Sequence, residues 1–99
     1  MDNQQPNQQK KQVQLKASDE VLKGFYANAM ITNHTKEELI LDFLSIFGQN
    51  GTVGARIITS PGHFKRMIKA LEGALKKYEE NFGEIKEAEE VDKEIGFRG

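Results

Sequence analysis

Residues 52–71 read TVGARIITSPGHFKRMIKAL, and the spacing of the apolar side chains changes once within this stretch. Before Ser60, apolar residues alternate with other residues, as they do in a β-strand. After Ser60 they recur every three or four residues, which is typical of an amphipathic helix. Ser60 is a favourable N-cap, and Pro61 suits the first helical position, where its missing N–H costs nothing. The stretch therefore predicts a strand that runs directly into a helix.

The predicted helix continues to Phe82 and ends at Gly83, because glycine commonly follows the last helical residue. Its apolar residues form one continuous stripe, made of Phe64, Met67, Ile68, Leu71, Leu75, Tyr78 and Phe82. The opposite side is charged and includes Glu72 and Lys76, an ion pair with favourable order and four-residue spacing. We expect the apolar stripe to pack on one face of a sheet.

Two further strands are expected before residue 52. Residues 24–32 alternate between two faces, and residues 38–47 form a nearly continuous apolar run. A polar cluster separates these two segments, and the Asn-Gly pair at residues 50–51 predicts the tight turn of a β-hairpin. Residues 13–17 also alternate, which would add a fourth, leading strand. The predicted fold class is α+β: an antiparallel β-meander of three to four strands, followed by one long amphipathic C-terminal helix packed on one sheet face.

Length and composition limit the class of protein. The chain has 99 residues, a net charge of −1 and no cysteine, so we expect one domain with neither disulfides nor thiolate metal sites. No apolar run approaches the roughly 18–20 residues that cross a bilayer, and the first residues lack the apolar segment of a signal peptide. We therefore expect a cytoplasmic protein without a membrane partner. Residues 1–12 are predicted to be a flexible polar arm, residues 13–85 a single domain, and residues 86–99 an acidic flexible tail.

The predicted middle strand is apolar on both of its faces. One face holds Leu39, Leu41, Phe43 and Phe47, and the other holds Ile40, Leu44 and Ile46. A single helix covers only one face of a sheet, and an uncovered antiparallel face is normally polar. We therefore expect Ile40, Leu44 and Ile46 to form the interface of a homodimer or a higher even oligomer. The alternative is a monomer in which the leading strand or the tail covers this face.

The sequence offers no catalytic or metal-binding pattern. His34 lies in a predicted turn and His63 in the first turn of the helix, and neither has a His or carboxylate three or four residues further on within its own element in a ligand-like arrangement. Gly48, Gly51 and Gly54 resemble a phosphate-binding loop in spacing, but the Lys-Ser/Thr of such a loop does not follow. We expect a protein that is not an enzyme, with no catalytic residues, no metal and no cofactor.

Asp42 is the one carboxylate inside the predicted apolar strand, with apolar residues on both sides of it. A buried, unpaired carboxylate is costly, so we expect it to pair with Arg56 on the adjacent strand. We interpret Asp42 and Arg56 as a structural pair that fixes the strand register. The alternative is an acid whose pKa is shifted for a functional purpose.

The predicted helix carries a local excess of positive charge, with five basic against three acidic residues between positions 61 and 83. Lys65, Arg66 and Lys69, joined by Arg56, would form a basic strip suited to a nucleic-acid backbone. The alternative interpretation is an ordinary solvated helix face.

Four short motifs occur in order along the chain. They are Gly24-x-Tyr26-x-Asn28, Glu38-Leu39-Ile40-Leu41-Asp42-Phe43, Ala55-Arg56-Ile57-Ile58-Thr59-Ser60-Pro61-x-His63-x-Lys65-Arg66 and Tyr78-Glu79-x-x-Phe82-Gly83-x-Ile85. In this combination the chain resembles a widespread family of small bacterial and archaeal proteins known only as a domain of unknown function. The resemblance spans residues 13–85 and departs at GQNGTVG, which is shorter than the family's loop and lacks its usual proline. It implies a self-sufficient domain and no particular activity.

Two known architectures are compatible with this order of elements. SecB-like export chaperones oligomerise through small sheet-plus-helix subunits and expose apolar grooves, whereas single-strand-binding proteins present basic residues on dimeric sheets. Both are analogies at the level of the fold. From the residues, we expect a non-enzymatic homo-oligomeric domain that presents a sheet or helix surface to a protein partner. The alternative is a nucleic-acid-binding regulatory protein.

Overall fold

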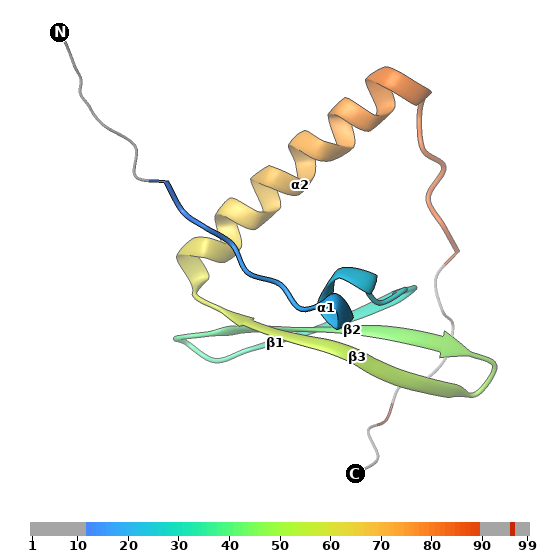
Figure 1. Ribbon diagram of the computed structural model, residues 1–99. Helices are drawn as coiled ribbons and strands as arrows, with labels where there is room; N and C mark the ends of the chain where they lie inside the picture. The colour runs from blue at the N-terminus through green and yellow to red at the C-terminus, as the bar shows by residue number, and fades with distance from the viewer. Residues whose placement is uncertain (1–11, 90–95, 97–99) are drawn as a thin grey trace, which may run out of the picture.

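The computed structural model describes residues 12–89 and residue 96 (Figure 1). Its elements are, in order, α1 (Asp19–Lys23), β1 (Ala29–His34), β2 (Leu39–Phe47), β3 (Asn50–Thr59) and α2 (Pro61–Phe82). The three strands form an antiparallel meander with β2 in the middle. The predicted α+β order, with the sheet first and the long helix last, is confirmed. The arm predicted at residues 1–12 and the tail predicted at residues 86–99 lie largely outside the described residues.

The segment before β1 differs from the prediction, because residues 13–17 form no strand. The short helix α1 follows instead, and the Ser18 side chain caps it by accepting a hydrogen bond from the Val21 N–H at 3.2 Å. Gly24 ends it with a φ of 79°. A serine followed by two acidic residues favours a helix start through local hydrogen bonds and the helix dipole. The alternation at 13–17 has no neighbouring strand with which to pair, so the described sheet has three strands.

The turn between β2 and β3 lies two residues earlier than predicted. Gly48 and Gln49 make the connection, with Gly48 at a φ of 62°, whereas Asn50 and Gly51 already belong to β3. In this register Gly51 faces Ile46, whose Cγ1 would be only 3.2 Å from a Cβ at position 51. The absence of a side chain at Gly51 therefore leaves room for Ile46 on the neighbouring strand. Gly48 supplies the left-handed conformation that the turn requires.

Asn28 lengthens the ladder between β1 and β2 with its side chain. Its Nδ2 donates to the carbonyl oxygen of Ile46, and its Oδ1 accepts from the Ile46 N–H, both at 2.9 Å. Its own backbone N–H donates to the Leu44 carbonyl oxygen at 2.9 Å. The side-chain amide thus replaces a backbone peptide just before β1 begins. This gives the asparagine of the first sequence motif a structural role.

A β-bulge in β3 accommodates an aromatic ring. The register pairs Phe43 with Ala55 and Leu44 with Val53, so Gly54 is the additional residue. A Cβ at Gly54 would overlap the ring of Phe25. The missing side chain therefore makes room for that ring, which connects the segment after α1 to the sheet.

Helix α2 starts at the predicted cap, with Ser60 Oγ accepting from the His63 N–H at 3.2 Å, and it ends at Gly83, whose φ is 94°. Figure 1 shows α2 rising away from the sheet beyond its first turns. Phe64 and Met67 are half-buried, and no residue of α2 is buried. Ser60 alone joins β3 to α2, so the cap geometry fixes the angle at which the helix leaves. In the single chain, the expected packing on the sheet is thus limited to the start of the helix.

Candidate interaction surface

The apolar stripe of α2, defined as Phe64, Met67, Ile68, Leu71, Leu75, Tyr78 and Phe82, is the main exposed apolar feature of the helix. Leu71 is 67 % exposed, Leu75 is 47 % exposed and Phe82 is 73 % exposed. By contrast, Leu41 and Leu44 are the only buried apolar residues of the described part of the chain. An exposed apolar surface of neighbouring large side chains typically marks a contact with another macromolecule.

The far end of this stripe is held in a defined shape. The rings of Tyr78 and Phe82 lie with centroids 4.9 Å apart. Beyond them, the Gly83 N–H donates to the Glu79 carbonyl oxygen at 2.8 Å, and the Ile85 N–H donates to Glu79 Oε2 at 3.0 Å. These bonds satisfy the end of the helix and explain the glutamate and glycine of the last sequence motif. The aromatic end of the stripe is therefore presented by an ordered helix terminus.

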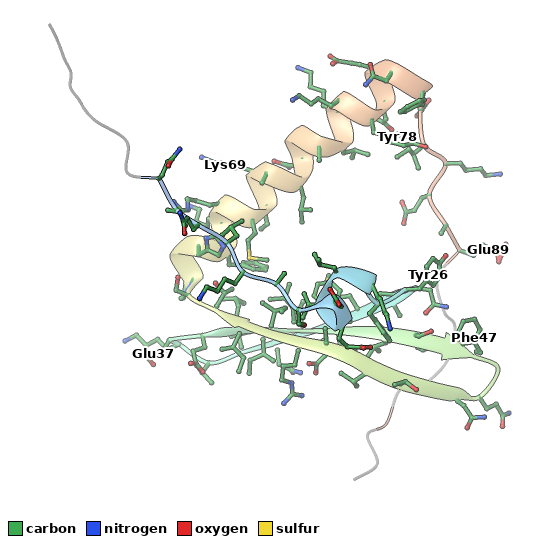
Figure 2. The ribbon with its side chains drawn as sticks, viewed as in Figure 1. Tyr26, Glu37, Phe47, Lys69, Tyr78 and Glu89 are labelled. Atoms are coloured by element: carbon green, nitrogen blue, oxygen red, sulfur yellow. The ribbon has the colours of Figure 1, made fainter. Side chains whose placement is uncertain are left out.

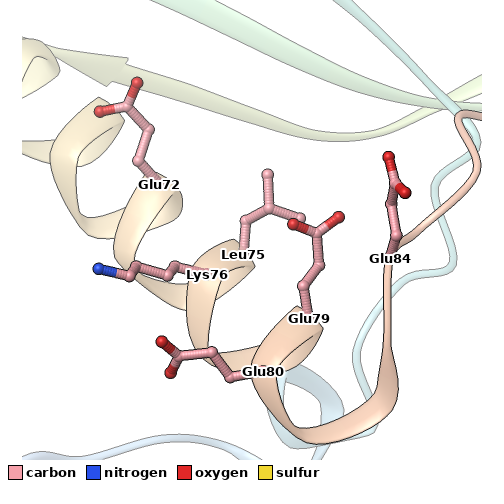
Figure 3. A pocket seen from close by; sticks show the side chains of 6 residues that line it. All are labelled: Glu72, Leu75, Lys76, Glu79, Glu80 and Glu84. Carbon is pink, nitrogen blue, oxygen red and sulfur yellow. The ribbon is translucent and has the colours of Figure 1, made fainter.

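An open pocket lies beside the second half of α2 (Figure 3). It is lined by Glu72, Leu75, Lys76, Glu79, Glu80 and Glu84. Figure 3 shows Leu75 and Glu79 directed to the same side, while Lys76 and Glu80 point elsewhere. Within the residues that the structure describes, no three His, Asp or Glu side chains are grouped so that they would hold a metal ion. The pocket is thus lined mainly by acidic side chains and lies beside the α2 stripe.

Asp42 and Arg56, paired in the sequence analysis, face each other in the β2–β3 register. Arg56 Nε donates to Asp42 Oδ1 at 2.7 Å and Nη2 donates to Oδ2 at 2.8 Å. The Asp42 side chain is 1 % exposed, whereas that of Arg56 is 55 % exposed. The hydrogen bonds and charge of Arg56 hold the pKa of the Asp42 carboxyl below its usual value, and Asp42 raises the pKa of Arg56. Both groups therefore stay charged at neutral pH, which suits an ion pair that fixes register.

The residues that the sequence predicts as an oligomer interface have limited surface in the single chain. Leu44 is 3 % exposed, and Ile40 and Ile46 are half-buried. Strand alternation and the cross-strand register place all three on the same face as Asp42. The α2 stripe, which the sequence analysis assigned to the core, offers the larger accessible surface. Its spacing was visible in the sequence, but spacing does not tell what a helix packs against.

The predicted basic strip is divided by the structure. Lys65, Arg66 and Lys69 are exposed on the first half of α2, and Figure 2 shows Lys69 extending from the side away from the sheet. Arg66 Nη2 lies 3.1 Å from His63 Nδ1. The Arg56 guanidinium is instead held by Asp42 on the sheet. Of the predicted strip, the basic side chains that no described carboxylate holds are therefore the three on α2.

Comparison with known proteins yields one match. The model of a protein family described as "Protein of unknown function (DUF3467)" matches residues 1–87, which include the whole sheet and all of α2. No curated protein and no solved structure matches the chain. Within the described part, neither helix is both long and apolar enough to cross a membrane.

Proposed function

The chain belongs to the DUF3467 family of proteins of unknown function, and we propose that it acts as a non-enzymatic, homo-oligomeric interaction domain that presents its surface to a protein partner. The observation that carries this proposal is the exposure of the α2 stripe in the single chain. The proposal keeps the oligomer expected from the sequence and moves its main contact from the sheet face to the helix.

Energetics support an oligomer. Full burial of a leucine or phenylalanine side chain stabilises a protein by roughly 1.5–3 kcal/mol relative to leaving it exposed. Leu71, Leu75 and Phe82 forgo much of that stabilisation in the single chain. A domain of this size has little stability to spare, because small chains bury a smaller share of their surface. Covering the stripe with a second copy would supply the missing burial.

The placement of the reactive side chains supports a role in binding. The carboxylate of Asp42 is held by both donors of Arg56, and His63 lies against Arg66 at the helix start. Ser60 caps α2 through its hydroxyl oxygen. Each of these groups thus has a partner that explains its position within the fold.

Native mass spectrometry of the untagged protein at low salt tests the proposal. We expect an even-numbered oligomer for the native sequence and a monomer for Leu71→Lys, because a buried lysine would be costly in the interface. Glu80→Lys, on the opposite side of the same helix, is the matched control and should leave the oligomer intact. A native chain that stays monomeric at tens of micromolar would contradict the proposal.

A second candidate function is favoured by the charge of the first half of α2. Residues 61–71 contain Lys65, Arg66 and Lys69 and no acidic residue. A nucleic-acid backbone would bind there with an affinity that falls steeply as the salt concentration rises. Titration with single- and double-stranded oligonucleotides at low salt tests this function, with the triple variant Lys65→Glu, Arg66→Glu, Lys69→Glu as the control. A flat titration would eliminate it.

A further inference from the structure

We propose that two copies of the chain associate by packing their α2 helices antiparallel, with Lys65 of each copy opposite Glu79 of the other. This inference rests on the proposed homo-oligomer and names its interface. It is carried by the spacing of the exposed apolar residues, by the charges beside them and by the distribution of charge along the helix.

The apolar residues of α2 follow the spacing of a coiled coil. Successive seam residues are alternately four and three positions apart: Phe64, Ile68, Leu71, Leu75, Tyr78 and Phe82. This is the a/d pattern of a heptad repeat, and every a and d position of α2 is apolar. Two helices with this pattern bury their seams against each other. In α2 the seam is exposed from Ile68 onwards.

The residues beside the seam favour the antiparallel orientation. One flank carries Lys65, Glu72 and Glu79, spaced by seven residues, and the other carries Met67, Ala74 and Asn81. Figure 3 shows Glu72 and Glu79 on the same side as Leu75 of the seam. In a parallel pair each charged flank would face an uncharged flank of the other helix, so no ion pairs would form. In an antiparallel pair like flanks face each other, which brings opposite charges together.

A single antiparallel register satisfies the seam and the charges together. Pairing all six seam residues places Phe64 opposite the partner subunit's Phe82, Ile68 opposite the partner subunit's Tyr78, and Leu71 opposite the partner subunit's Leu75. The two-fold axis then passes between the helices at the level of Gly73, midway between Leu71 and Leu75. In coiled-coil geometry the residue numbers of facing seam positions add to 146, whereas those of facing positions on the charged flank add to 144. Lys65 therefore faces the partner subunit's Glu79, and Glu72 faces the partner subunit's Glu72. The charges were not used to choose the register, yet it forms two Lys65–Glu79 pairs, which outnumber the single like-charge Glu72–Glu72 contact at the axis.

The charges along α2 also favour an antiparallel partner. The first turn has no acidic residue and the last turn has no basic residue. Beside the seam, Lys65 lies toward the positive end of the helix dipole, and Glu79 lies in the last turn, near the negative end. This distribution is unfavourable in an isolated helix. An antiparallel neighbour brings its acidic end to each basic end and so compensates for it.

The geometry of Glu79 suits this ion pair. Its Oε2 accepts from the Ile85 N–H at 3.0 Å, which holds the carboxylate in a fixed position at the helix end. No bond to its Oε1 is found among the described residues. Lys65 is exposed and free to reach a neighbouring helix. The carboxylate is therefore pre-positioned for a contact from outside the chain.

Cysteine cross-linking tests the orientation directly, because the chain has no cysteine of its own. With a short bis-maleimide, Glu72→Cys should link two copies to each other, since position 72 lies beside the two-fold axis. Lys65→Cys and Glu79→Cys should link when mixed, and neither should link efficiently alone. These two positions are about 21 Å apart along one helix, beyond the reach of the reagent.

Charge reversal supplies a second, independent readout. Lys65→Glu and Glu79→Lys should each weaken dimerisation roughly tenfold, because each replaces two attractive contacts by two repulsive ones. The double variant, carrying both changes in one chain, should recover most of the native affinity. The recovery cannot arise within one helix, given the separation of the two positions. Glu79→Lys and the double variant both lose the hydrogen bond between Glu79 and Ile85. A difference in affinity between these two variants therefore cannot come from that bond.

The possible outcomes separate this inference from the proposed function. Cross-linking at position 72 together with recovery in the double variant supports the antiparallel α2 interface. A dimer that persists without either result has its interface elsewhere, for example on the sheet, and overturns this inference while the proposed oligomer stands. A native chain that is monomeric by mass spectrometry overturns both.

Discussion

Among single residues, Asp42 places the strongest constraint on the sheet. Its carboxylate is removed from water and is held by two hydrogen bonds from Arg56 on the neighbouring strand. Removing one partner of such a pair leaves a charge without compensation, which is costly in a buried position. A slip of β2 against β3 would separate the two groups. The pair therefore favours one strand register over the alternatives.

Asp42→Asn is expected to lower the melting temperature at pH 7, and the difference from the native protein should shrink as the solution becomes more acidic. Folding lowers the pKa of Asp42, so its stabilising contribution is complete above the usual value of 3.8 and is lost as the pH falls through the lowered pKa. Asparagine resembles the protonated state. Circular dichroism melts between pH 7 and pH 2.5 measure the difference, with exposed Glu37→Gln as the control. A difference that stays constant over this range would argue against an ionised Asp42.

Gly54→Ala is expected to destabilise the protein by about 1–3 kcal/mol, as overpacking does in other proteins. The new Cβ would overlap the Phe25 ring. Urea denaturation measures the change, and Gly73→Ala is the matched control, because position 73 is open and alanine should stabilise the helix there by roughly 0.5–1 kcal/mol. Combining Gly54→Ala with Phe25→Leu should cost less than the sum of the two single changes. Additive costs would show that the ring and the bulge are not coupled.

Among the secondary-structure elements, those with local chemical signals were predictable. Ser60, Pro61 and Gly83 set the ends of α2 in the sequence, and the structure has the helix between them. The β2–β3 turn was misplaced because Asn50-Gly51 is a strong local signal, whereas the contact between Gly51 and Ile46 depends on the register of two strands. Helix α1 was missed although Ser18 and the acids after it carried its signal. Alternating residues predict a strand only where a second strand is present to pair with it.

The start of β1 depends on a side chain that sequence patterns do not reveal. Asn28→Ala should remove both side-chain bonds to Ile46 and destabilise the protein by about 1–3 kcal/mol. The Ile46 amide should then exchange its hydrogen with solvent much faster, as hydrogen exchange measured by NMR would show. Asn33→Ala, at an exposed position of β1, is the control and should leave that amide protected. Unchanged protection of Ile46 would mean that other parts of the sheet hold this strand end.

For the molecule as a whole, the sequence indicated which residues are apolar and charged but not which of them remain exposed. The spacing from Phe64 to Phe82 was assigned to packing on the sheet, because most amphipathic helices cover the core of their own chain. The extended backbone of the Ser60 cap instead directs α2 away from the sheet (Figure 1). The two-sided β2 predicted an exposed apolar sheet face, whereas in the structure Leu44 is buried and Ile40 and Ile46 are half-buried. The exposed apolar residues of α2 were thus visible as a stripe in the sequence, but their exposure was not predictable from it.

Thermal stability should depend on protein concentration if a second copy covers the α2 stripe. Dimerisation stabilises the folded state by mass action, so raising the concentration from 1 to 100 μM should raise the melting temperature by several degrees (roughly 2.7 kcal/mol at a hundredfold excess over the dissociation constant). Leu75→Lys should abolish this dependence, because it places a charge in the seam. Glu80→Lys changes charge on the opposite side and should retain it. If the native protein melts at one temperature across this range, it does not self-associate, which contradicts the proposed homo-oligomer.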